Sequence, residues 1–157
     1  MSHAFVRSVI AALLAWSLSA LSAHAQMPDG TVSVATRHSF DTLIERVEQA
    51  VAKNGLGVVA MASASRGAAS RGVKIPGNAV IMVFRNDYAV RMLAASVPAG
   101  IEAPLRLYLT ENRDGSTTLS YRAASAVFAP YRNAEIDRLA RELDGLLEKI
   151  SKDATGA

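Results

Sequence analysis

The sequence predicts a domain that combines β-strands with α-helices, and three observations support this class. Two long segments, beginning at Phe40 and Ile136, carry apolar residues at the spacing of an amphipathic helix. Other segments are shorter and alternate between apolar and polar residues, which is typical of strands. Leu105–Arg122 holds two such segments around an Asp-Gly pair, which predicts a β-hairpin.

The first 25 residues predict a signal peptide, and with it a periplasmic or secreted protein. Arg7 precedes an apolar run, Val9–Leu21, and Ala23-His24-Ala25 has the small-x-small form of a cleavage site. An uncleaved anchor is the alternative, but the run falls short of the stretch of about 20 apolar residues that spans a bilayer. We expect cleavage before Gln26, no membrane association afterwards, and a single domain over residues 26–157.

The composition that remains after residue 25 excludes several classes of function. Cleavage removes Arg7 from the 17 basic side chains and none of the 14 acidic ones, so the net charge falls from +3 to +2. A nucleic-acid partner usually meets a concentrated basic face, and we expect none here. With no cysteine and only His38 left, neither cysteine catalysis nor a zinc or copper site can be built, and we expect no metal and no cofactor.

The first half of the domain predicts a strand, a helix and a second strand. Thr31–Thr36 and Gly57–Ser63 are the two strands. Between them Ser39 is a plausible N-cap and Asn54-Gly55 a plausible stop for the helix. The apolar stripe of this helix consists of Phe40, Leu43, Ile44, Val47 and Val51.

The stretch SASRGAASRGVKIPGN, Ser63–Asn78, sets Arg66, Arg71 and Lys74 among small residues and could cradle an anion. It matches neither glycine-rich nucleotide-binding pattern. We favour a solvated helical turn followed by a Pro-Gly turn.

The second half begins with Ala79–Phe84, which is apolar at every position, so we expect an interior strand with both faces covered. A short helix capped by Asn86 and ending near Pro98 follows it. The last helix carries one apolar stripe, formed by Ile136, Leu139, Ala140, Leu143, Leu147 and Ile150.

The register of the hairpin follows from burial. A two-residue Asp-Gly turn would set Leu109 opposite Ser120 and mix apolar with polar side chains on each face. A three-residue loop, Arg113-Asp114-Gly115 with a left-handed glycine, sets Leu109 opposite Leu119 instead. We expect the second register, because a slip of one residue would turn the apolar face of a strand to solvent.

This register places Arg106 opposite Arg122, on the same face as Tyr108. Facing like charges are destabilising by roughly tenths of a kcal/mol or more. We expect the guanidiniums to splay into water and stack on Tyr108, or an anion to lie between them. That anion could be Glu111, Glu102 or a ligand, and this is the best candidate site in the sequence.

Three segments resemble a bacterial and archaeal family known only as domain of unknown function 302: HSFDTLIERVEQAVAKNGL, RGVKIPGNAVIMVF and GIEAPLRLYLTENRDGSTTLSY. In the last segment Pro104, Glu111, Gly115 and Tyr121 stand in matching places. The resemblance covers nearly all of the chain after residue 25. It implies an α+β fold, with an antiparallel sheet of about five strands, two long helices packed mainly on one face, and two short helices.

The departures from the family limit what is implied about chemistry. Many members carry an Ile-Asp-His run where Ala62, Ser63 and Ala64 stand here, so chemistry that rests on that Asp and His is not implied. Arg85-Asn86-Asp87 replaces a Gly-Asn-Pro after the third strand. The family itself has no settled activity.

Three hypotheses on function follow. The first is a non-catalytic binding domain for a small amphipathic or anionic ligand or a protein partner. Its binding residues would be Arg106, Tyr108, Arg122 and Glu111. The second is an enzyme of unknown reaction with Glu111 or His38 moving a proton near Tyr121, although a surface or capping position is the simpler reading of that histidine. The third is a structural homodimer joined by an open sheet face, unless Ala124–Tyr131 covers that face.

Overall fold

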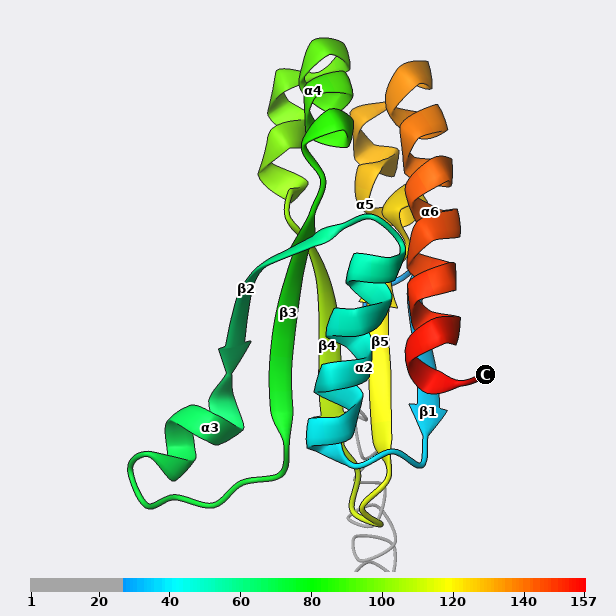
Figure 1. Ribbon diagram of the computed structural model, residues 1–157. Coiled ribbons are helices and arrows are strands. Elements are labelled where there is room, and N and C mark those ends of the chain that lie inside the picture. The colour runs from blue at the N-terminus through cyan, green and yellow to red at the C-terminus, as the bar shows by residue number, and fades with distance from the viewer. Residues whose placement is uncertain (1–26) are drawn as a thin grey trace, which may run out of the picture.

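Five strands form one antiparallel sheet in the order β1-β5-β4-β3-β2 (Figure 1). The computed structural model describes residues 27–157, and the predicted signal peptide lies outside them. The hairpin strand β5 pairs with β1 and the hairpin strand β4 pairs with β3, so β4 is the central strand of the sheet. The strand bounds are Thr31–Thr36 for β1, Gly57–Ser63 for β2, Asn78–Phe84 for β3, Leu105–Glu111 for β4 and Thr117–Arg122 for β5.

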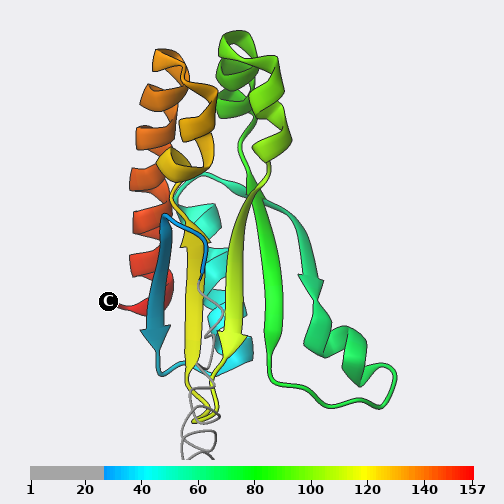
Figure 2. The same cartoon turned by 180° about the vertical axis from the view of Figure 1, so that it is seen from behind.

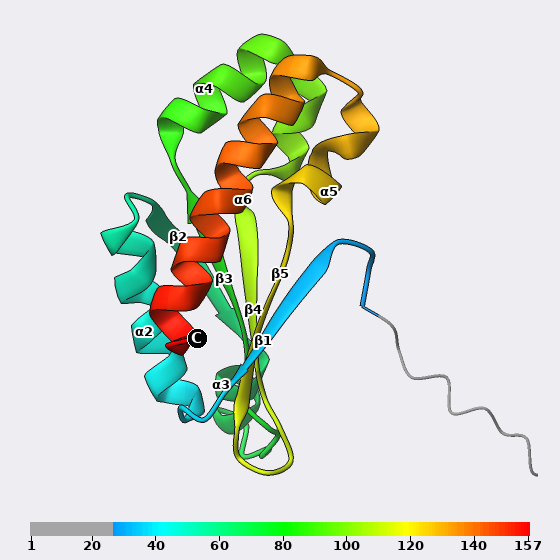
Figure 3. The same cartoon turned by 90° about the vertical axis from the view of Figure 1, so that its right-hand side faces the viewer.

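Two long helices, α2 and α6, lie side by side on one face of this sheet, which confirms the predicted α+β fold (Figures 1 and 3). Shorter helices occupy the connections. The bounds are Phe40–Lys53 for α2, Ala64–Ala69 for α3, Asn86–Ala95 for α4, Ala124–Phe128 for α5 and Ala134–Thr155 for α6. Two 3₁₀ turns, η1 at Val97–Glu102 and η2 at Ala129–Tyr131, complete the connections.

Side-chain caps fix the ends of the long helices. Ser39 Oγ accepts a hydrogen bond from the Thr42 N–H, and the Asn54 side chain donates to the Ala50 carbonyl at the other end of α2. In α6, Asn133 Oδ1 accepts from two free N–H groups of the first turn, and Gly156 ends the helix in the left-handed conformation. The predicted cap and stop of the first helix are therefore confirmed.

The sheet face beneath α2 and α6 is the core, and the hairpin register that burial predicts is confirmed. Leu109 lies opposite Leu119 and Leu107 opposite Tyr121. The loop residue Gly115 has φ +80°. All three leucines are fully buried.

On the other face of the sheet no helix of residues 27–157 lies over the central strands, and we call it the open face (Figure 2). On β3, Ile81 is fully buried on the helix side, whereas Val80 and Met82 on the open face remain partly exposed. The expectation that both faces of this strand are covered is therefore wrong. Ala124–Tyr131 does not cover the open face either, because α5 packs against α6 and η1 and buries Phe128 there.

The chain enters β1 in close contact with α5, at Gly30. This glycine has φ +74°, and a Cβ built on it would lie 2.2 Å from the Cβ of Ala126. Its carbonyl also accepts a hydrogen bond from the Ala123 N–H, at 2.8 Å. Neither the backbone conformation nor the space at this position admits a side chain.

Gly30→Ala is expected to lower the free energy of unfolding by about 2–4 kcal/mol, from left-handed strain together with overpacking. In an Ala126→Gly background the same substitution should cost only the strain, about 1–2 kcal/mol. Urea denaturation of the four proteins measures both costs. Equal costs in the two backgrounds would contradict the contact between β1 and α5.

Candidate functional site

The open face is divided into a polar half and an apolar half by the strand register. Ser120 of β5 faces Ser33 of β1 on one side and Tyr108 of β4 on the other. Tyr108 in turn faces Val80 of β3. The open face therefore carries hydroxyl groups from β1 to β4 and aliphatic side chains beyond β4.

Arg106, near the start of β4, and Arg122, at the end of β5, lie at one end of the open face. Both are exposed, and the register that pairs Leu107 with Tyr121 sets the two arginines across from each other. Together they line a hollow of about 190 Å³, which Tyr108 and Ser120 also line and which Met27 and Pro28 border. The structure therefore brings three of the four predicted binding residues to one place.

Neither arginine of this pair forms an ion pair with any carboxylate of residues 27–157. The predicted stacking on Tyr108 is not formed, since the arginine–aromatic contacts within this part of the chain involve Tyr88 instead. The reason lies in the direction of Tyr108, whose hydroxyl accepts a hydrogen bond of 2.6 Å from Asn78 Nδ2 on β3. That bond draws the phenol toward β3 and away from the guanidiniums.

Glu102 is the acidic group associated with the arginine pair. It lines a second hollow, of about 50 Å³, together with both arginines. Its Oε1 accepts a hydrogen bond of 3.0 Å from the Tyr131 hydroxyl, which holds the carboxylate outside ion-pair distance of the guanidiniums. Burial raises the pKa of Tyr131, and the neighbouring carboxylate raises it further, so the hydroxyl remains a donor.

Glu111, the fourth predicted binding residue, lies away from the arginine pair. Its Oε2 accepts a hydrogen bond of 2.7 Å from the backbone N–H of Gly77, and its own N–H donates to the Gly77 carbonyl. It stands at the far end of β4, five residues from Arg106, and therefore about 16 Å along the strand. Odd-numbered residues of β4 also point to the helix side.

The residues of the enzyme hypothesis are also separated. His38 sits at the entrance of α2, where its carbonyl accepts a hydrogen bond from Thr117. Tyr121 is buried at the opposite end of β5, and burial raises its pKa, followed by the charges of Glu148 and Asp144. Thr117 and Tyr121 are four residues apart on this strand, about 13 Å.

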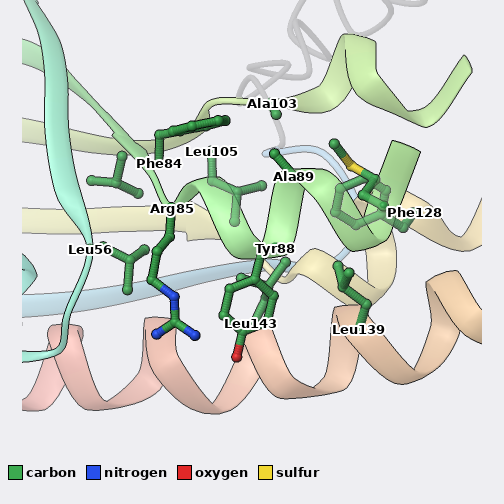
Figure 4. Close-up of a pocket in the computed structure, with 12 residues that line it drawn as sticks. Leu56, Phe84, Arg85, Tyr88, Ala89, Ala103, Leu105, Phe128, Leu139 and Leu143 are labelled. Atoms are coloured by element: carbon green, nitrogen blue, oxygen red, sulfur yellow. The ribbon is translucent and has the colours of Figure 1, made fainter. Parts of the chain in front are cut away.

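A second cavity, which the sequence did not predict, lies where β3 meets α4 and α6 (Figure 4). Its walls are apolar, and Arg85 and Tyr88 stand over it. Its volume is about 30 Å³, room for about two water molecules. The walls include Leu56, Val83, Met92, Leu105, Phe128, Leu139 and Leu143.

The charges around Tyr88 are paired with one another. The Arg85 guanidinium lies 4.3 Å from the centre of the Tyr88 ring and that of Arg91 lies 5.3 Å from it. Arg85 makes two hydrogen bonds to Asp87, and Arg91 makes two of 2.8 Å to Glu142. This cluster could have been predicted from the sequence, because residues three apart are neighbours on a helix and Arg85, Tyr88 and Arg91 have that spacing. A cavity of this size under a neutral cluster leaves little room for a ligand.

The ion pair between α4 and α6 makes stability depend on pH. Arg91 lowers the pKa of Glu142 from its ordinary 4.5, so the pair stabilises the fold above that pH and is lost as pH falls through the lower folded value. Arg91→Ala is therefore expected to reduce stability at pH 7 by more than at pH 3, measured by urea denaturation. Arg71→Ala, which removes an exposed arginine in the connection between α3 and β3, should show no such pH dependence. An Arg91→Ala loss of equal size at both pH values would contradict this role of the pair.

The described residues, 27–157, offer neither a metal site nor a membrane-spanning helix. No group of three or more His, Cys, Asp or Glu side chains there is placed to hold a metal ion. No helix in the same part of the chain has both the length and the apolar character needed to cross a membrane.

These features define a class of open-faced α+β domain, with two helices on one side of an antiparallel sheet and, on the other, an arginine pair that has no carboxylate partner within residues 27–157. The family model described as "Domain of unknown function DUF302" matches residues 32–154, and the chain belongs to this family. Among solved structures, the uncharacterized conserved protein DUF302 from Bacillus stearothermophilus is similar in fold. Its TM-score is 0.71 at 16% identity, over 80% of this chain and 99% of that one. No curated protein matches the chain.

Proposed function

We propose that the protein is a non-catalytic binding domain that takes a small anionic or amphipathic ligand on the open face. The anion lies between Arg106 and Arg122, in the hollow bordered by Met27 and Pro28. One observation carries the proposal: two guanidiniums face each other across neighbouring strands without a carboxylate partner among residues 27–157.

The energetics favour an anion at this place. Facing residues of an antiparallel pair have Cα atoms only about 4.5–5.5 Å apart, so both side chains reach a single bound group. A guanidinium binds a carboxylate or phosphate through two parallel charge-assisted hydrogen bonds, which are roughly twice as strong as neutral ones. Binding an anion therefore replaces a repulsion between the arginines with attractions to both.

The floor of the site supports binding because its polar groups are already held. Ser120 Oγ is hydrogen bonded to Ser33 Oγ at 2.8 Å, and Tyr108 is held by Asn78. A floor that needs no rearrangement lowers the entropic cost of association.

The geometry disfavours the other two hypotheses. An enzyme using Glu111 near Tyr121 would need groups that lie at opposite ends of β4 and β5. A two-fold dimer through the open face would use the same patch of both copies, and would bring together two hollows that each carry a net positive charge. A ligand of opposite charge meets neither difficulty.

The ligand-binding test uses octanoate as an anionic amphiphile and isothermal titration calorimetry as the measurement. Arg106→Ala/Arg122→Ala is expected to weaken binding by at least about tenfold, because each arginine donates charge-assisted hydrogen bonds. Arg37→Ala/Arg113→Ala is the matched control, since both residues are exposed and it removes the same net charge. It should leave the affinity within about twofold.

A third variant changes the local charge in the opposite direction. Glu102→Gln removes the negative charge beside the arginine pair and should strengthen octanoate binding by a fewfold at low salt. Equal weakening in both arginine doubles, or no response to Glu102→Gln at low salt, would remove the arginine pair as the anchor.

We also propose that the binding domain acts outside the cytoplasm. Support comes from the apolar run and the Ala23-His24-Ala25 signature of the sequence. Expression of the whole chain in a Gram-negative host should yield a periplasmic product that begins at Gln26, as measured by its intact mass. A product that keeps residues 1–25 in the soluble cytoplasmic fraction would contradict export.

A further inference from the structure

We infer that the ligand is an amphipathic carboxylate that lies across the strands, with its head on the arginine pair and its apolar tail on β3 and β2. This rests on the proposed function, because the same two arginines hold the head. It adds the chemical class of the ligand and the direction of its tail.

The register gives the open face an apolar path that starts at the arginine pair. Across β4 and β3, Arg106 faces Met82, which in turn faces Ala60 of β2. One row further along, Val80 of β3 faces Ala62 of β2. The four side chains beyond the arginine are thus aliphatic, and no charge interrupts them.

The opposite direction from the arginine pair is polar. Arg122 of β5 faces Thr31 of β1, and Ser120 faces Ser33. A tail that ran toward β1 would cover hydroxyl groups, at a cost in desolvation. A tail that runs toward β2 covers Val80 and Met82, which are partly exposed, and two exposed alanines.

Tyr108 forms the border of this path. Its hydrogen bond to Asn78 places the hydroxyl end of the side chain over β3, on the side of Val80 and not of the guanidiniums. The ring therefore leaves the arginines free for the head of a ligand and offers its apolar body to the tail.

The local charge fits a head with a single negative charge. Glu102 lines the smaller hollow with both arginines, so two positive charges and one negative charge meet there. A carboxylate balances the remaining positive charge, whereas a phosphate monoester, with a charge of about −1.5 to −2, would leave excess negative charge beside Glu102. A carboxylate also offers about four acceptor positions, enough for both guanidiniums.

The spacing of the strands sets the useful length of the tail. Neighbouring strands lie about 4.8 Å apart, so β2 is about 12 Å from the midpoint between β5 and β4, two and a half spacings away. A medium-length linear chain covers this distance. Longer chains pass the sheet edge at β2 and gain nothing further from it.

The test is a chain-length series titrated calorimetrically into the purified protein: acetate, butanoate, hexanoate, octanoate and dodecanoate. Affinity should rise about two- to fourfold for each added methylene, because each buries apolar surface on β3 and β2. The rise should stop once the chain passes β2. Val80→Thr/Met82→Gln keeps the size of both side chains and should flatten the rise while leaving acetate binding unchanged.

Ala35→Thr is the matched control, because it adds a hydroxyl to the polar half of the same open face. It should leave the whole series as it is in the wild type. Octyl phosphate distinguishes the head groups, and it should bind more weakly than octanoate.

The contrary outcomes separate this inference from the proposed function. Arginine-dependent binding without a chain-length rise, or tighter binding of octyl phosphate than of octanoate, would overturn the inference and leave the proposed function standing. A chain-length rise that ignores the arginine double variant would overturn both. Both would also be overturned if sedimentation showed a self-association that octanoate reverses equally in the wild type and in the arginine double variant. The open face would then be the contact surface for a second copy of the chain.

Discussion

The alternation of side chains along β4 and β5 is the constraint on which the rest of the structure depends. The loop at Gly115 sets Leu109 opposite Leu119, so both leucines face the long helices. Arg106 and Arg122 are then forced onto the other face. A slip of one residue would bury the guanidiniums beneath the long helices, at a cost of roughly several kcal/mol for each charge.

Core packing therefore holds the arginine pair together against its own repulsion. Burying one leucine stabilises the fold by about 1.5–3 kcal/mol, whereas facing like charges cost only about tenths of a kcal/mol or somewhat more. The register is decided by the larger effect. The repulsion remains in the folded state, and a bound anion can relieve it.

Two pairs of neighbouring arginines within residues 27–157 differ in their surroundings. Arg85 and Arg91 enclose Tyr88, and each has its own carboxylate, so this cluster joins α4 to α6 and is electrically satisfied. Arg106 and Arg122 share a hollow with a carboxylate that Tyr131 holds at a distance. The first pair is explained by the fold alone, and the second is not.

The sequence predicted what depends on local periodicity. The strands, the two long helices, the hairpin register and the facing arginines all follow from alternation or helical spacing over a few residues. The bond from Glu111 to Gly77 could not be predicted, because the two residues are 34 positions apart and meet only when β3 pairs with β4. The direction of Tyr108 depends on Asn78 for the same reason, and the packing of α5 on α6 required the position of the last helix.

The arginine pair of the open face, and not the cavity beneath Tyr88, is the proposed ligand site. The most direct measurement is a nuclear magnetic resonance titration with octanoate that follows the side-chain Nε–H signals of the arginines. We expect saturable shifts for Arg106 and Arg122, together with backbone shifts along β3 to β5, and unchanged signals for Arg85 and Arg91. Shifts confined to Arg85 and Arg91, or none for Arg106 and Arg122 at saturation, would contradict this site.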